Sequence, residues 1–96
     1  MGTVGGMQPL KRVTAPTVDV LRAILESSGP VFGLDLMKRS GRPSGTIYPI
    51  LERLERQGWI SSVWEESVTT QLHRRRVYEF TAEGRAAAVD LLGTRG

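Results

Sequence analysis

The segment from Gly45 to Ile60 constrains the fold more than any other part of the chain. Apolar residues recur in it at helical spacing until Gly58, and Trp59-Ile60 then opens a run typical of a strand. The buried face of this helix is predicted to hold Ile47, Ile50, Leu51 and Leu54. Its first turn carries small, polar and aromatic groups where an ordinary solvent face would carry charges. The segment therefore predicts a surface helix that passes directly into a strand.

Pro49 lies inside this helix, where a proline removes one backbone hydrogen bond and crowds the preceding turn. The helix is predicted to begin near Pro43 or Ser44. Either its first turn is late or loose and becomes regular near Thr46, which we favour, or the helix is bent at Tyr48-Pro49. Arg42 precedes a proline, so its backbone is expected to be extended. Gly58 is the expected C-cap.

Two shorter helices are predicted before this segment. The first opens with Thr14 as its N-cap and ends at Gly29-Pro30, a cap glycine followed by a residue that cannot continue a helix. The second covers about Phe32 to Arg39, and its last turn carries Lys38 and Arg39, where cations are favoured by the helix dipole. Together with the segment after them, these helices predict a helix-turn-helix.

A basic hairpin is predicted after residue 58. Residues 59–65 and 74–80 have the composition of strands, and a polar turn separates them. Alternation along the second strand turns Tyr78 and Phe80 to one side, where we expect them to pack on the helices. The hairpin would form the wing of a winged helix.

The last predicted helix covers residues 81–92, with Thr81 as its N-cap and Gly93 as its end. The expected fold is mainly α with a small β-hairpin (α+β), a winged helix-turn-helix in the order α-α-α-β-β-α. With 96 residues the chain has room for one small domain. Residues 1–12 are predicted to be a flexible tail and residues 13–93 the domain.

Composition excludes several classes of protein. The chain has no cysteine, which rules out disulfides, cysteine-ligated zinc and thiol catalysis. No apolar run approaches the roughly 20 residues that a membrane span needs, and no signal peptide is apparent at residues 1–7. We therefore expect a cytoplasmic protein. The net charge of +3 is compatible with nucleic acid without demonstrating it.

Catalysis has little support in the sequence. The lone His73 has no cysteine partner, and Glu65 and Glu66 are adjacent in a strand, so they point to opposite sides. No phosphate-binding loop is present. Trp59 and Trp64 could line a ligand cavity, although core and hairpin packing is the commoner role of such residues. We predict no enzyme, no cofactor and no metal site.

DNA recognition needs a narrow element for the major groove, side chains that reach base edges and cations near the phosphates. Gly45 and Thr46 keep the leading end of the third helix slim, and Ser44 and Thr46 can form hydrogen bonds. Tyr48 can give its hydroxyl to a phosphate while its ring packs on the protein. The alternative roles are a helix cap for Ser44 and a core position for Tyr48.

The arginines at 74–76, beside His73, would lie near the wing tip over the minor groove or the flanking backbone. The alternative is a solvated edge strand, because basic residues also discourage aggregation of strand edges. Arg76 differs from the other two arginines, because the alternation of side chains along the strand can direct the apolar part of its side chain to the core. Arg53 and Arg56 are weaker candidates, because an outer helix face is usually charged.

Two spaced motifs resemble the PadR family of bacterial transcriptional regulators. The first is Gly-x-Ile-Tyr-Pro-x-Leu at residues 45–51, and the second is Arg-x-Tyr-x-x-Thr-x-x-Gly at residues 76–84. The resemblance covers roughly residues 13–92. It implies a homodimeric winged helix that represses transcription from a pseudo-palindromic operator. It also implies that Ser44, Thr46, Tyr48 and Pro49 lie at the major groove, with Lys38, Arg42, Arg74 and Arg75 nearby.

Family members dimerise largely through C-terminal helices, aided by the first helix, and some form an effector pocket between subunits. Here only one short helix follows the hairpin, a departure that weakens the expectation of such a dimer and such a pocket. Our hypothesis is a homodimer through the first helix and the edge formed by residues 86–92. No residue pattern points to a particular small-molecule effector.

Two other functions remain open. One is a winged helix that binds another protein and not DNA, which would need an exposed apolar surface on the third helix. The other is a small architectural or phage-encoded protein that binds all duplexes with similar affinity, with a steep loss of affinity in salt.

Overall fold

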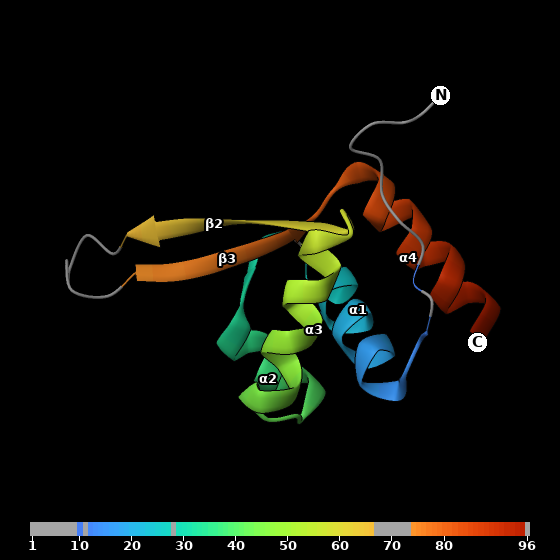
Figure 1. Cartoon of the computed structure of the whole chain (residues 1–96), viewed down its shortest axis with the longest axis horizontal. Coiled ribbons are helices and arrows are strands. Elements are labelled where there is room, and N and C mark those ends of the chain that lie inside the picture. Colours follow the sequence, from blue (N-terminus) through green and yellow to red (C-terminus); the bar gives the residue numbers. More distant parts are fainter. Residues whose placement is uncertain (1–9, 11, 28, 67–73, 96) are drawn as a thin grey trace.

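The computed structural model describes residues 10, 12–27, 29–66 and 74–95, with side chains except at 66, 74, 75, 94 and 95, and these residues contain four helices and three strands. Their order is α1 (Ala15–Glu26), β1 (Val31–Phe32), α2 (Gly33–Ser40), α3 (Ser44–Arg56), β2 (Ile60–Glu66), β3 (Arg74–Phe80) and α4 (Ala82–Arg95). Figure 1 shows the β2–β3 hairpin projecting from the helices on one side, with α4 on the other. The predicted α+β winged helix-turn-helix is confirmed. Most of the predicted tail lies outside the described residues.

α1 is bounded by hydroxyl side chains at both ends. As predicted, Thr14 caps its start and accepts a hydrogen bond of 3.4 Å from the N–H of Thr17. The predicted end at Gly29 is wrong, because the last helical residue is Glu26 and the cap is Ser27. The backbone N–H of Ser27 and its hydroxyl both donate to the carbonyl of Ile24, at 3.2 and 2.9 Å. The serine therefore satisfies a terminal carbonyl before the glycine is reached.

A third strand precedes α2 where the sequence predicts the start of a helix. Val31 and Phe32 pair antiparallel with Tyr78 and Val77 of β3, so the sheet order is β1-β3-β2. The prediction that the second helix includes Phe32 is wrong, and α2 begins at Gly33. Two residues are too few to show an alternating pattern, and their pairing depends on a partner far along the chain.

α3 is a regular helix from Ser44 onward, so the expected loose first turn is also wrong. The carbonyl of Pro43 accepts hydrogen bonds of 3.0 Å from the N–H groups of both Thr46 and Ile47. Pro49 therefore lies within a continuous helix. The buried face consists, as predicted, of Ile47, Ile50, Leu51 and Leu54.

The end of α3 is closed by a glycine in the left-handed region, but the predicted cap is one residue too late. Gln57 is the cap, and Gly58 follows it with φ of 85°. The N–H of Gly58 donates to the carbonyl of Glu55 at 3.1 Å, and that of Trp59 donates to Leu54 at 2.9 Å. This pair of bonds is the Schellman arrangement, which satisfies the last carbonyls and turns the chain into β2.

The core lies where α1, α2, α3 and α4 meet the sheet. Tyr78 is buried in it and Phe80 packs against it, as predicted. Trp59 is also a core residue, which decides between its two proposed roles. α4 continues through Gly93 to Arg95, so the predicted end of the last helix at Gly93 is wrong. A glycine only lowers helix propensity, by about 1 kcal/mol, and does not force a helix to end.

The end of α3 and the start of α4 meet at a junction formed by Gly58, Trp59, Thr81 and Gly84. The Thr81 hydroxyl donates to the carbonyl of Gly58 at 2.8 Å and accepts from the N–H of Gly84 at 2.9 Å, so Thr81 is the predicted N-cap. A Cβ atom at Gly84 would overlap the backbone carbonyl of Trp59. Only a residue without a side chain lets the two backbones approach this closely. We call this contact the α3–α4 junction.

None of the described helices is long and apolar enough to cross a membrane.

Candidate nucleic-acid interface

α3 presents one solvent-facing stripe along its length. Gly45, Pro49 and Arg53 follow one another at intervals of four residues and are all exposed. Ser44, Glu52 and Arg56 flank them and are exposed as well, whereas Thr46 is half-buried. We call this stripe the outer face of α3. Ser44 is the first residue of the helix and its side chain makes no cap, which removes its alternative role.

Tyr48 lies at the boundary of this face, with 44% of its side chain exposed. Its phenol rests on the start of α2, because a Cβ atom at Gly33 would overlap the Tyr48 hydroxyl. The tyrosine is therefore not a core residue, and its ring packs on the protein near solvent, as the sequence predicts.

A groove of about 540 Å³ lies between the start of α2, Tyr48 and the hairpin. It is lined by Phe32, Gly33, Leu34, Asp35, Tyr48, Trp64, Arg76 and Tyr78. Leu34 and Trp64 are more than half exposed in it. Of the two tryptophans considered as cavity residues, Trp64 lines this groove and Trp59 does not.

A polar network joins α3 to both strands of the hairpin. Ser62 on β2 donates a hydrogen bond of 2.6 Å to the Glu55 carboxylate and accepts one of 2.9 Å from Nε of Arg76 on β3. The Nη2 atom of Arg76 lies 3.4 Å from the second Glu55 oxygen. The Arg76 guanidinium also stands 5.2 Å from the centre of the Trp64 ring. We call Glu55, Ser62 and Arg76 the wing brace, because they fix the base of the hairpin relative to α3.

The sequence does not single out Glu55 or Ser62. The available signal is alternation, which puts Arg76 on the same side of its strand as the buried Tyr78 and so directs it toward the helices. Its partners lie 14 and 21 residues away, beyond the range of any local pattern.

Tyr78 should make the fold sensitive to alkali. Burial raises the pKa of its hydroxyl above the usual 10.0, with Arg76 lowering it and Tyr48 and Glu55 raising it. The folded state then holds the proton more tightly than the unfolded state, so the free energy of unfolding falls as pH rises above about 10. Urea unfolding at about pH 8 and about pH 11 should show a smaller fall for Tyr78→Phe than for the wild type. The matched control is Tyr48→Phe, and an equal fall in all three chains would contradict this assignment.

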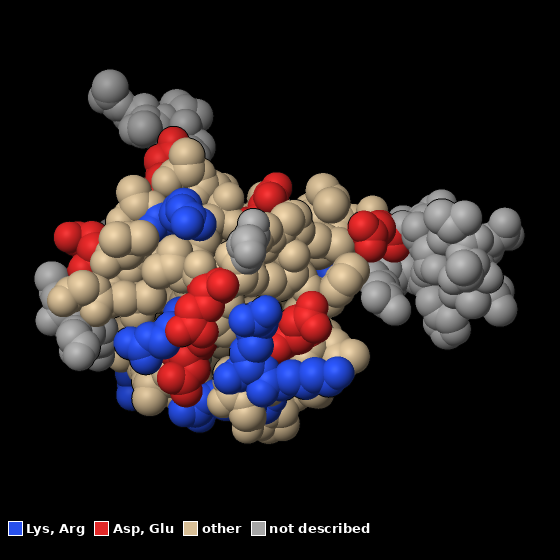
Figure 2. Space-filling model, turned by 180° about the vertical axis from the view of Figure 1, so that it is seen from behind, with Lys and Arg blue, Asp and Glu red and all other residues tan. Residues whose placement is uncertain are grey.

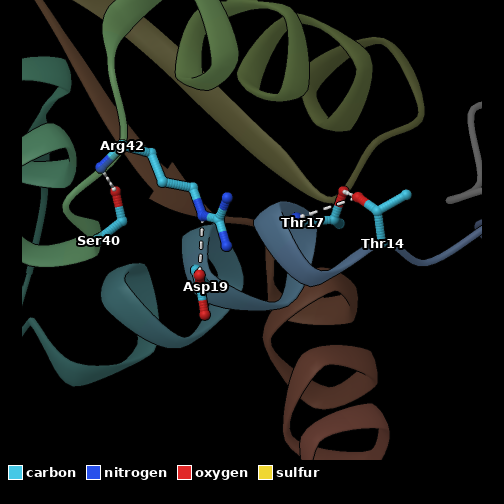
Figure 3. A network of polar contacts seen from close by, with 5 residues as sticks. All are labelled: Thr14, Thr17, Asp19, Ser40 and Arg42. Atoms are coloured by element: carbon cyan, nitrogen blue, oxygen red, sulfur yellow. Dashed lines mark hydrogen bonds and ion pairs between the residues drawn. The ribbon is translucent and has the colours of Figure 1, made fainter.

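Arg42, a predicted DNA contact, is held within the protein. Its Nε atom donates to Oδ2 of Asp19 on α1 at 2.9 Å, and its backbone N–H donates to the Ser40 hydroxyl at 3.2 Å. Figure 3 shows the guanidinium directed at Asp19 from the turn between α2 and α3. Both side chains are about one-third exposed. The ion pair therefore ties this turn to α1 while the guanidinium still reaches solvent.

Three of the predicted cations belong to elements other than α3. Lys38 is exposed in the last turn of α2. Arg74 and Arg75 belong to β3. In the strand register they stand opposite Glu66 and Glu65 of β2, at the end of the hairpin far from α3. Their side chains lie outside the described ones, as does the whole of His73. The structure thus assembles residues 44–49 and Arg53 on one helix and leaves the wing-tip residues as a prediction.

The face opposite to the view of Figure 1 carries mixed charge. Figure 2 shows basic and acidic side chains lying next to one another over the lower part of this face. Such a surface offers no continuous basic patch to a phosphate backbone. Within the described part of the chain, no three His, Cys, Asp or Glu side chains gather where they could hold a metal ion.

Residues 20–90 match the model of the transcriptional regulator PadR-like family. The chain is similar to the PcaV transcriptional regulator from Streptomyces coelicolor, solved with its natural ligand (27% identity, TM-score 0.70, 88% of this chain and 56% of that one). It is also similar to smu.1704 from Streptococcus mutans UA159 (28% identity, TM-score 0.67, 85% of this chain and 78% of that one). A third similar structure is a padr family transcriptional regulator from Eggerthella lenta DSM 2243 (29% identity, TM-score 0.63, 81% of this chain and 69% of that one). The chain spans just over half the length of PcaV, and no curated protein matches it.

Proposed function

Because the chain belongs to the PadR-like family of transcriptional regulators, which are not enzymes, we propose that it is a sequence-specific repressor. It binds a pseudo-palindromic operator as a homodimer, in the cytoplasm. The observation that carries this proposal is the outer face of α3, whose leading end exposes Ser44, Gly45 and Pro49 with no bulky side chain among them. A helix of that shape fits the major groove of a duplex.

The proposed base contacts come from the first two turns of α3. Ser44 and Thr46 supply hydroxyl groups, Gly45 allows close approach and Pro49 supplies an apolar surface of the kind that meets a thymine methyl group. The Tyr48 hydroxyl, which lies beside the start of α2, donates to a phosphate.

The proposed phosphate contacts come from α2, from the turn before α3, from α3 itself and from the wing. Lys38 is exposed on α2, and Arg42 keeps its terminal amino groups for a phosphate while Asp19 holds its Nε. Arg53 follows on the outer face of α3. Arg74 and Arg75 at the wing contact the minor groove or the flanking backbone.

The operator can be selected directly from random DNA, so the regulated gene need not be identified first. Purified protein is mixed with a library of random duplexes at near-physiological salt, and the bound duplexes are sequenced. An enriched inverted repeat is the expected result, and its spacing gives the separation of the two recognition helices. Duplexes recovered without a shared motif would point to a weakly specific architectural protein instead.

Dimerisation is proposed through α1 and α4. Val89 is 52% exposed on α4, although it is a large apolar residue, and Leu91 and Leu92 nearby are only partly buried. Val89→Asp should shift the protein to monomer, because an isolated carboxylate would be desolvated in the interface. Sedimentation velocity at concentrations well above the DNA-binding midpoint would measure the shift. Ser61→Asp, an exposed position on β2, is the control that should remain dimeric, and a monomeric wild type would refute the dimer.

One observation favours a second function. The groove beside α2 exposes Leu34 and Trp64 along with Tyr48, which is the kind of apolar surface that a protein partner covers. These residues lie mostly on α2 and β2, while the outer face of α3 is polar. If no duplex is recovered from the library, the protein-interaction module becomes the leading function.

A further inference from the structure

Pro49 changes the hydrogen bonding of α3 at one defined carbonyl. In a regular helix, the N–H of residue 49 would donate to the carbonyl of residue 45. Proline has no N–H, and α3 is nevertheless continuous from Ser44 to Arg56. The carbonyl oxygen of Gly45 therefore lacks its helical donor, although it stands in the second position of a well-formed helix.

The backbone at Gly45 is exposed to solvent. No atom lies within 4 Å of the place where its Cβ would stand. Pro49 is exposed one turn further along the same outer face. The Pro49 ring lies beside this oxygen in the place of the missing N–H. A carbonyl has two lone pairs and tilts outward on the solvent side of a helix, so its second lone pair can accept a hydrogen bond from a molecule that approaches the outer face of α3.

We propose that the Gly45 carbonyl reads an exocyclic amino group of a base in the major groove, and that Pro49 determines this specificity by withholding its N–H. The inference rests on the proposed function. In the major groove only the N6 amino group of adenine and the N4 amino group of cytosine are donors, whereas guanine and thymine present acceptors. An acceptor on the protein thus selects adenine or cytosine at one position of the operator.

The carbonyl must be distinguished from side-chain acceptors on the same face. Ser44 and Glu52 are exposed there and could also accept a hydrogen bond from an amino group. Neither is changed by the presence or absence of an N–H at residue 49. A substitution that adds this N–H alone therefore isolates the contribution of the carbonyl.

The test compares three full-length chains. The wild type has no N–H at residue 49, Pro49→Ala restores it, and a chain with lactic acid at 49 keeps the methyl group of alanine but replaces the N–H with an ester oxygen. Each is titrated with the selected operator and with duplexes that lack one amino group at a time, using purine for adenine and 2-pyrimidinone for cytosine. Thermal melting confirms that all three fold, and Pro49→Ala should melt highest because proline disfavours helix interiors.

At one base pair, loss of the amino group should weaken the wild type and the lactic-acid chain about five- to tenfold, and Pro49→Ala by less than about twofold. The base analogue that produces this effect identifies adenine or cytosine. Equal sensitivity of the three chains at every position would overturn the role of the carbonyl and leave the repressor proposal intact. Failure of the library to yield any operator would remove both proposals together.

Discussion

Gly84→Ala is expected to lower the free energy of unfolding by about 3 kcal/mol. A Cβ atom at this position would overlap the backbone carbonyl of Trp59, and a backbone cannot rotate away as a long side chain can. Relief requires α4 to move from the α3–α4 junction, which also stretches the bond from the Thr81 hydroxyl to the carbonyl of Gly58. Urea unfolding followed by tryptophan fluorescence would measure the change, since Trp59 is buried at this contact.

Gly93→Ala provides a control in the same helix. Gly93 is also part of α4, but nothing lies within 4 Å of its would-be Cβ atom. The same substitution there should stabilise the protein by up to about 1 kcal/mol, because alanine favours a helix more than glycine does. The same substitution should therefore lower the free energy of unfolding at Gly84 and raise it at Gly93. A Gly84→Ala protein as stable as the wild type would show that the close approach to Trp59 is absent in solution.

Thr46→Ala is expected to weaken binding to the selected operator by about 1–3 kcal/mol and to relax the preference at one base pair. Thr46 is half-buried in the first turn of α3, so its side chain has a restricted orientation and loses little freedom on binding. Thr46→Ser keeps the hydroxyl and should retain most of the preference. Titrations of the operator and of its single-base variants, followed by fluorescence anisotropy, would measure both effects.

Lys38→Ala is the contrasting control for a phosphate contact. It should weaken all duplexes by a similar factor and flatten the dependence of log affinity on log salt by about one unit. If Thr46→Ala instead weakened every duplex alike and Lys38→Ala relaxed the preference at one base, the proposed roles of the outer face of α3 and of α2 would have to be exchanged.

Local patterns in the sequence predict most of the fold. The buried face of α3, the caps at Thr14 and Thr81 and the closing glycine at Gly58 each depend on residues within a few positions of one another. β3 has the predicted bounds because alternation and composition agree over its length. These features involve short-range hydrogen bonds and side-chain periodicity, which a single sequence displays directly.

The errors have specific physical causes. β1 exists only because β3, more than 40 residues later, pairs with it. α1 ends at Glu26 because the hydroxyl of the next residue, Ser27, satisfies the carbonyl of Ile24 before Gly29 is reached. α4 passes through Gly93 because a glycine permits a helix to end without forcing it to do so. The sequence predicts that Pro49 loosens the first turn of its helix, but Pro43 supplies the acceptor that keeps this turn regular.

In the candidate interface too, the sequence predicts the features that depend on neighbouring residues and misses those that depend on distant ones. Residues 44–49 could be chosen from the sequence because they share one helix and one face. The wing brace and the ion pair between Arg42 and Asp19 could not, since each joins elements whose proximity is set by the folded core. Arg42 forms an ion pair with Asp19 within the protein, and the same guanidinium is proposed to contact a DNA phosphate.

At the α3–α4 junction, the Thr81 hydroxyl donates to the carbonyls of Gly58 and Trp59 and so ties the end of α3, the proposed recognition helix, to the start of the helix proposed to join two subunits. In a dimer with such a connection, the separation of the two α3 helices would be fixed, so the spacing between the half-sites would be recognised as well as their sequence. Each base pair inserted between the half-sites moves them about 3.4 Å apart and also rotates one around the duplex axis. If the junction is stiff, the subunits of the proposed dimer cannot move apart to follow such an insertion, so the DNA itself would have to bend.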